Sequence, residues 1–174
     1  MIQNKRKTIL ELAKELKTPQ QNLAHLKTLI KKTSKLPIDF NTKIYRGRTL
    51  LHYAVIGRNS GVIPLLVKIG VNPNLCDDDF NTPLHFAIIN NAYYAVYELL
   101  KLPQIDKNAT SEFEQTPLHK AVITGNLDII KLLVKSGADF NLVDEKNLTP
   151  FDYAMDEGEQ SIINYLKDLK MKGE

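Results

Sequence analysis

The chain has 174 residues, the length of one ordinary domain or of one short repeat array. Its 43% hydrophobic and 25% charged residues are typical of globular proteins and exclude a disordered chain. The single cysteine excludes an internal disulfide, and the apolar runs are far shorter than the roughly 20 residues of a membrane helix. The basic start is followed by no apolar signal region, so we expect a soluble, cytoplasmic protein.

The net charge of +3 hides a polarised distribution. Residues 1–35 hold nine basic and two acidic side chains, a balance of +7, which leaves 14 basic and 18 acidic side chains, a balance of −4, for the rest. Lys outnumbers Arg by 19 to 4, as in proteins of AT-rich genomes.

The first 40 residues predict two helices. Apolar residues recur at helical spacing on either side of Pro19, at Ile9, Leu12, Ala13 and Leu16 and then at Leu23, Leu26, Leu29 and Ile30. These residues lack the Thr-Pro-Leu-His motif and its variants, which recur from residue 49 onward. We therefore predict that residues 1–40 form a basic helix pair that caps the N-terminal end of the stacked repeat units.

A repeat follows this segment. Thr-Pro-Leu-His occurs at residues 82–85 and 116–119, Thr-Leu-Leu-His precedes them at 49–52, and Thr-Pro-Phe-Asp follows at 149–152. The four Thr residues are separated by 33, 34 and 33 positions, and an Ala lies five residues after each. Thr is a favoured N-cap residue and Pro a favoured first helical residue, so each motif predicts the start of a helix.

This period and signature resemble those of the ankyrin repeat family. The resemblance covers residues 40–169 and implies an all-α fold, an ankyrin-repeat solenoid of four units behind the N-terminal pair. Each unit would be a finger loop followed by two antiparallel helices, at about 44–76, 77–110, 111–143 and 144–170, within a repeat region of residues 41–174. One unit cannot bury its apolar face alone, so stacking builds the core.

Several residues depart from the family pattern. The family usually has Gly two residues before the Thr, and only Gly47 keeps it, whereas Phe80, Glu114 and Asn147 replace it. Phe adopts a positive φ poorly, so we expect a distorted second finger. Pro103 replaces the Gly at the end of the second unit's last helix, which predicts an altered loop, and Arg58 takes the Gly place between the first unit's helices.

Candidate chemical groups are few. His52, His85 and His119 occupy equivalent places in successive units. Packed helices lie about 8–10 Å apart, whereas a zinc ligand must come within about 2.1 Å of the metal, so these residues cannot share one ion and should bind finger backbone instead. The acidic run 77–79 lacks the spacing of a calcium loop, and Cys76 has no His or Asp partner at a position that the repeat places nearby. We expect no catalytic residue, metal or cofactor.

The resemblance also implies a binding face. In ankyrin repeats, the finger tips and the exposed end of each first helix form a concave partner-binding surface. The matching residues here are Tyr45, Arg46, Arg48 and Ile56, then Asp78, Asp79, Asn81, Ile89 and Asn90, then Glu112, Phe113, Gln115, Ile123 and Thr124, and finally Glu145, Lys146 and Leu148. Aromatic anchors, an Ile row and peripheral charge are typical of interfaces, although scattered exposed apolar residues also occur without function. Phe80 is either a further exposed anchor or folded back on the stack.

The sequence therefore predicts a non-catalytic module that binds another protein, takes no small-molecule substrate and is monomeric alone. Basic first fingers and acidic later ones would orient the partner. Short ankyrin proteins of AT-rich intracellular bacteria resemble effectors that act in the host cytosol, which is one setting for such a module. An alternative is a binder of anionic membrane surfaces or nucleic acid through the basic N-terminal pair, although this pair has no aromatic residue to stack on bases.

Overall fold

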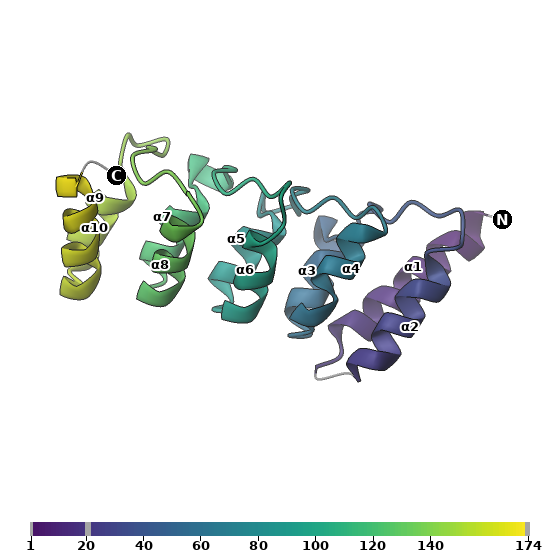
Figure 1. The fold of residues 1–174 in the computed structure, drawn as a ribbon. Helices are drawn as coiled ribbons and strands as arrows, with labels where there is room; N and C mark the ends of the chain where they lie inside the picture. Colours follow the sequence, from purple (N-terminus) through teal and green to yellow (C-terminus); the bar gives the residue numbers. More distant parts are fainter. Residues whose placement is uncertain (1, 20–21, 173–174) are drawn as a thin grey trace.

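The computed structural model describes residues 2–19 and 22–172, and these residues form helices and loops without any strand. The helices follow one another in a row along the molecule (Figure 1). Their bounds are α1 Ile2–Lys17, α2 Leu23–Thr33, α3 Leu50–Ile56, α4 Ile63–Lys68, α5 Pro83–Ile89, α6 Tyr93–Leu100, α7 Pro117–Ile123, α8 Leu127–Lys135, α9 Pro150–Glu157 and α10 Gln160–Lys172, with short 3₁₀ turns at Tyr45–Gly47, Ser60–Val62 and Glu112–Glu114. The expected all-α repeat solenoid with a leading helix pair is confirmed.

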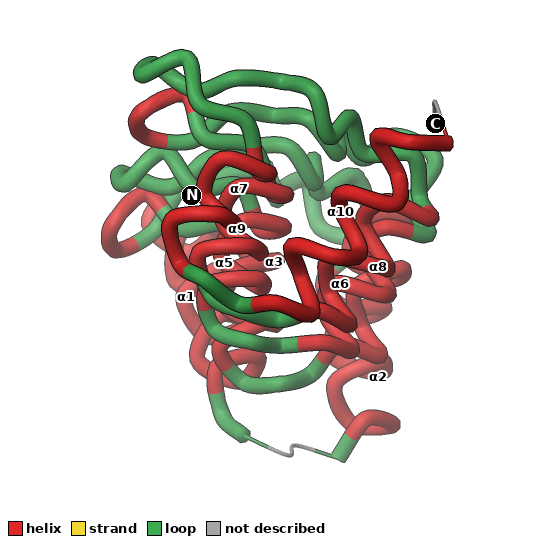
Figure 2. Tube along the Cα trace, turned by 90° about the vertical axis from the view of Figure 1, so that its left-hand side faces the viewer, coloured by secondary structure: helices red, strands yellow, loops and turns green. Residues whose placement is uncertain are grey.

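The helices lie in two layers (Figure 2). We call α1, α3, α5, α7 and α9 the inner helices and α2, α4, α6, α8 and α10 the outer helices. Each inner helix packs against the next inner helix, as in α3 against α5 and α5 against α7. Figure 2 shows that the finger loops project past the inner helices on one side, so the cross-section is L-shaped. The fingers are residues 44–48, 77–81, 111–115 and 144–148, numbered 1 to 4.

Local sequence sets the bounds of the helices. The Thr82 and Thr116 hydroxyls cap α5 and α7 by accepting the N–H of the histidine three residues on, and a Pro occupies the first turn of each helix. Gly137 follows the end of α8 with a φ of 86°, and Gly158 ends α9 with a φ of 73°. A residue without a Cβ adopts this left-handed conformation freely, so the chain turns back sharply at both places.

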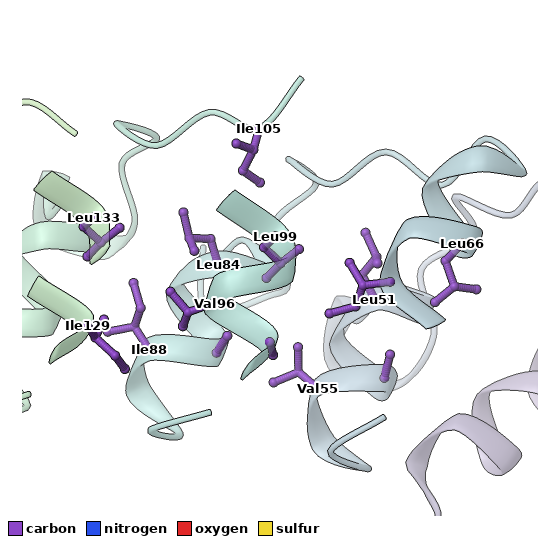
Figure 3. Close-up of a cluster of buried hydrophobic side chains, with 14 of the residues drawn as sticks. Leu51, Val55, Leu66, Leu84, Ile88, Val96, Leu99, Ile105, Ile129 and Leu133 are labelled. Carbon is purple, nitrogen blue, oxygen red and sulfur yellow. The ribbon is translucent and has the colours of Figure 1, made fainter. Parts of the chain in front are cut away.

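The core runs continuously from unit to unit. Figure 3 shows side chains of the inner and outer helices meeting between units, including Leu51, Leu84, Ile88, Val96 and Ile129. Leu84 and Ile88 lie on α5, whereas Leu51, Val96 and Ile129 lie on α3, α6 and α8, and each of the five is fully shielded from solvent. Burying one such side chain contributes about 1.5–3 kcal/mol, so the stacking of units is the main source of stability.

The N-terminal pair joins this stack through α1, which packs against α3. The buried Asn59 side chain donates hydrogen bonds to the carbonyl oxygens of Leu16 and Thr18, at 2.9 and 3.0 Å. Gly57 lies so close to the end of α1 that a Cβ there would come within 2.0 Å of the Leu16 carbonyl oxygen. The last turn of α1 is therefore fixed to the turn between α3 and α4.

The expected distortion of the second finger is wrong. Phe80 adopts a φ of 58°, and the equivalent Gly47, Glu114 and Asn147 also have positive φ values. Finger 2 still closes with a hydrogen bond from the Asp77 N–H to the Asn81 carbonyl, at 2.9 Å. The Asp77 carboxylate holds this turn because it accepts the N–H groups of Asp79 and Asn81. These bonds offset the cost of a left-handed Phe.

The altered loop near Pro103 is confirmed. The first and third units leave their outer helices through Gly70 and Gly137, both with positive φ. No described residue from 101 to 106 has a positive φ, and the chain turns instead through a hydrogen bond from the Ile105 N–H to the Leu102 carbonyl. Ile105 is buried, so this longer loop still packs against the core.

Candidate partner-binding face

The four fingers share one closing hydrogen bond and differ in how their turns are stabilised. In each, the N–H of the first residue donates to the carbonyl of the fifth, as in Ile44 to Arg48 and Ser111 to Gln115. Fingers 1 and 3 turn through two consecutive left-handed residues, whereas Asp77 and Asp144 brace fingers 2 and 4 by accepting two backbone N–H groups each. Every finger is thus a short, hydrogen-bonded hairpin and not a loose loop.

Neighbouring fingers also bond in pairs. The Asp78 N–H donates to the Arg46 carbonyl, and the Glu145 N–H donates to the Phe113 carbonyl, both at 3.1 Å. Gly47 is required at the first pair, since a Cβ there would lie 2.2 Å from a carboxylate oxygen of Asp78. The fingers therefore form a pre-organised edge, which lowers the entropy that a partner's binding would cost.

A histidine in each of the first three units fixes the next finger. The Thr49 N–H donates to Nδ1 of His52 at 3.1 Å, so the proton is on Nε2, which donates to the Asn81 carbonyl at 3.0 Å. His85 and His119 contact the Gln115 and Leu148 carbonyls in the same way. Burial lowers the pKa of His52 and of His85 to about 4, so both are neutral at physiological pH. The expected backbone-binding role of these histidines is confirmed.

Gln115 departs from its predicted place on the partner face. Its side chain is buried, and its amide donates to the Tyr153 hydroxyl at 2.9 Å, which in turn donates to Asp144 at 2.6 Å. Burial acts to raise the pKa of Asp144, but hydrogen bonds from Tyr153 and from backbone N–H groups outweigh burial and leave the pKa below its ordinary value. Gln115 is therefore buried and joins the third and fourth units through Tyr153.

Most of the other predicted residues are exposed. Tyr45 is 76% exposed, Phe113 is 51%, and Ile89 and Ile123 are 44% and 39%. Phe80 is 62% exposed, so it extends outward and does not fold back. Arg46, Asp78, Asn90, Glu112, Thr124, Glu145 and Lys146 are exposed, whereas Arg48, Ile56, Asp79, Asn81 and Leu148 are half-buried. The structure thus exposes aromatic side chains on the fingers and Ile side chains at the ends of two inner helices.

The charges of the first two fingers neutralise each other. Arg46 Nη2 lies 2.8 Å from Asp79 Oδ2, and the Arg48 guanidinium faces the Asp77 carboxylate at 3.9 Å. Arg48 also lies over the Phe86 ring, 4.8 Å from its centre. These ion pairs reduce the expected contrast between a basic first finger and an acidic second finger, in which Asp78 remains exposed.

A series of asparagines forms hydrogen bonds between successive units, and the sequence pattern identifies only some of its members. Asn41 and Asn74 each bridge two segments: their amides donate to the Gly70 and Gln104 carbonyls, and their carbonyl oxygens accept the Asn72 and Asp106 N–H groups. Asn108 continues the series by accepting the Asp139 N–H at 2.9 Å. Its spacing of 34 from Asn74 could have identified it, but the irregular loop at Pro103 obscured the alignment.

Reactive chemistry is sparse in the described part of the chain. No three His, Cys, Asp or Glu residues there are grouped as a metal site would require. Cys76 is a free, half-buried thiol. Among the described helices, none combines the length and apolarity needed to cross a bilayer.

The comparisons with known proteins agree with this architecture. A family model described as ankyrin repeats in three copies matches residues 10–111 and 92–173. The chain is 32% identical over 136 residues to the fowlpox virus ankyrin repeat protein FPV223, an alignment that covers 78% of this chain and 94% of that protein. It is 36% identical over 100 residues to the mouse B-cell lymphoma 3 protein homolog, covering 56% of this chain and 22% of the relative. A match to alpha-latrocrustotoxin-Lt1a of Latrodectus tredecimguttatus, 32% identical, covers 90% of this chain but 10% of the toxin. The chain belongs to the ankyrin repeat family.

Proposed function

We propose that the face formed by the fingers and the inner helices binds a segment of a partner protein. Ankyrin repeats are generally protein–protein interaction modules. The observation that carries the proposal is the pair of exposed rows, Tyr45, Phe80 and Phe113 on the fingers and Ile89 with Ile123 on the inner helices. Exposed aromatic and aliphatic side chains on a rigid edge supply the anchors that dominate binding energy at interfaces.

Charge supports one orientation of the partner segment. With Arg46 and Arg48 already paired, the exposed acidic groups that remain on this face lie mostly in the third and fourth units, at Glu112, Glu114, Glu145, Asp156 and Glu157, with Asp78 in the second. Exposed basic groups lie at the opposite end, including Arg6 and Lys43. A partner segment whose basic end meets the fourth unit would associate faster and in one direction, with a rate that falls as salt increases.

Affinity capture with a double variant tests this proposal. Tyr45→Ala with Phe113→Ala removes two anchors that are not part of the core, so the variant should fold normally and capture its partner at least about tenfold more weakly. The matched control is Leu36→Ala with Met171→Ala, which removes two exposed apolar side chains outside the finger face. Equal capture by both double variants, with unchanged circular dichroism, would contradict the proposal.

The N-terminal pair supports a second candidate function. Lys5, Arg6 and Lys43 line a hollow of about 320 Å³ near the N-terminal end of α1, together with one acidic residue, Asp39, and their excess positive charge would attract anionic lipid or nucleic acid. Titration with acidic vesicles and with duplex DNA at low ionic strength tests it. Binding that weakens steeply with salt and is lost in Lys5→Glu would favour this candidate, and no binding at low salt would eliminate it.

The biological setting is also a proposal. The excess of Lys over Arg and the small size of the array support an origin in an intracellular bacterium, with action on a host protein after translocation. Fractionation of infected cells tests this setting. Protein found only inside the bacteria would contradict it and would leave the binding face itself unaffected.

A further inference from the structure

The outer side of the second unit carries tyrosines that the repeat does not require. Tyr93, Tyr94 and Tyr97 of α6, which we call the Tyr patch, are 40%, 75% and 43% exposed. Counted from the Thr that starts each unit, the equivalent residues are Ser60, Gly61 and Pro64 in the first unit, Leu127, Asp128 and Lys131 in the third, and Gln160, Ser161 and Asn164 in the fourth. Three other units form their outer helices without aromatic residues at these places, so stacking does not explain the patch.

A strained arginine lies beside the patch. Arg58, Asn91, Gly125 and Gly158 occupy the same place between inner and outer helix, and all four have a positive φ, from 52° to 73°. Gly adopts this conformation freely, whereas Arg does so at a conformational cost. Arg58 also forms no ion pair with any described acidic side chain.

Arg58, Tyr93 and Tyr94 line one shallow hollow of about 260 Å³, together with Ser60 and Asn91, and Tyr97 lies outside its lining. The Tyr93 and Tyr94 rings are in edge-to-face contact, nearly perpendicular at 86° with centres 5.8 Å apart, so together they present one angled aromatic surface. Figure 2 shows α6 in the outer layer, away from the side on which the fingers project. The Tyr patch is therefore directed away from the fingers, whereas Asn91 of the hollow directly follows Ile89 and Asn90 of the partner-binding face.

We propose that the Tyr patch and Arg58 dock a proline-rich segment of a partner protein that carries an acidic residue beside the prolines. A polyproline II segment has no internal hydrogen bonds, so its carbonyl oxygens are free to accept bonds from the Tyr hydroxyls, Ser60 and Asn91. Aromatic-lined grooves recognise such segments because a proline ring packs between aromatic walls. The unpaired guanidinium of Arg58 would bind the carboxylate in a charge-assisted hydrogen bond.

The hollow fits this occupant better than it fits an amphipathic helix. A helix presents an apolar stripe at least about 100° wide, which needs a broad apolar surface opposite it. Here the surface between the tyrosines and Arg58 adds only Ala92 and the buried Ala95. Lys101, which lies over the Tyr97 ring, is already paired with Glu98 at 3.3 Å, so Arg58 is the charged group left to select the ligand.

Titration of the full chain with synthetic peptides tests the proposal. The probe is a peptide of six prolines followed by two glutamates, and its controls replace either the prolines with alanine or the glutamates with lysine. We expect saturable binding of the probe, with amide NMR shifts confined to residues 58–60 and 91–97. Both control peptides should bind at least about tenfold more weakly, because each lacks one of the two recognised features.

Two variants keep the test independent of folding. Tyr94→Asp and Arg58→Gly each install the residue that another unit has at the same place, so the fold should accept both. Arg58→Gly should melt at the same or a higher temperature because it relieves the left-handed Arg, yet it should bind the probe about tenfold more weakly. Phe113→Ala, on the other face, should bind the probe as the unaltered chain does.

Three results would overturn the proposal. They are the lack of saturable binding at millimolar probe, binding that neither Tyr94→Asp nor Arg58→Gly weakens, and a concentration-dependent dimer in sedimentation that Tyr94→Asp abolishes. The last result would assign the patch to a second copy of the chain. None of them bears on the finger face, so the two proposals fail or succeed separately.

Discussion

The second and third units build the same pair of helices with different residues at their turns. Both start with Thr-Pro-Leu-His, and both bury the Leu and the His of this motif completely. The third unit turns between its helices through Gly125 and in its finger through left-handed Phe113 and Glu114, whereas the second uses Asn91 and left-handed Phe80. The interior and the helix caps therefore define the unit, and positions outside them are free to carry residues for binding.

The largest expected effect tests whether the two interiors are equivalent. Leu84→Ala and Leu118→Ala each remove a fully buried side chain, so each should lower the free energy of unfolding by about 2–5 kcal/mol. Urea denaturation of both variants measures the losses. A loss at one unit less than half of that at the other would show that the interiors are not equivalent.

A pH titration of stability should separate the two units. Unfolded His gains a proton near pH 6.5, whereas buried His85 resists protonation until about pH 4, so the free energy of unfolding should fall as the pH drops through this window. The contribution of His85 is on the order of a few kcal/mol. For His119, burial also lowers the pKa, but the nearby carboxylates of Asp144 and Asp152 oppose this effect, so its contribution should be smaller.

Urea denaturation at neutral pH and at pH values down to 4 measures this effect. His85→Asn should flatten the profile more than His119→Asn does. A profile that remains as steep in His85→Asn would assign the pH dependence to other groups.

Glycine substitutions in the finger turns should change the free energy of unfolding by a smaller amount and should increase it. Phe80→Gly relieves a left-handed Phe and should raise the free energy of unfolding by about 0.5–1 kcal/mol, after the added flexibility of the unfolded chain is subtracted. Glu114→Gly is the matched change in the third unit, and Asn147→Gly should gain less because Asn tolerates this conformation. Thermal melts rank the three variants, and destabilisation by Phe80→Gly would show that its ring contributes packing.

Loss of the ion pair between the first two fingers should have the smallest effect on the free energy of unfolding. Arg46 and Asp79 are each about half exposed, so Asp79→Asn should cost at most about 1 kcal/mol, and less at high salt. Denaturation at low and high salt compares this variant with the unaltered chain. A larger cost that salt does not reduce would mean that the pair orders finger 2.

The sequence was sufficient for features that repeat and insufficient for contacts between units. The register, the Thr caps and the role of the histidines follow from spacing alone. The left-handed Phe80 depends on two hydrogen bonds to Asp77, and the burial of Gln115 depends on Tyr153 in the next unit. The Arg46–Asp79 pair joins residues that lie 33 positions apart. Such contacts depend on which side chains meet after stacking, and the pattern of one unit does not contain this information.

The Thr–His–carbonyl contacts also give the array a direction. At each of three successive interfaces, a histidine of the earlier unit donates to a finger carbonyl of the later one. A unit in the middle of the array therefore has its donor on the side facing the next unit and its acceptor on the side facing the previous unit. A copy of the third unit inserted after the third unit would present a histidine donor to the fourth unit and a finger carbonyl acceptor to the original third unit. The molecule could thus be lengthened from within, while α1 and α10 remain at its two ends.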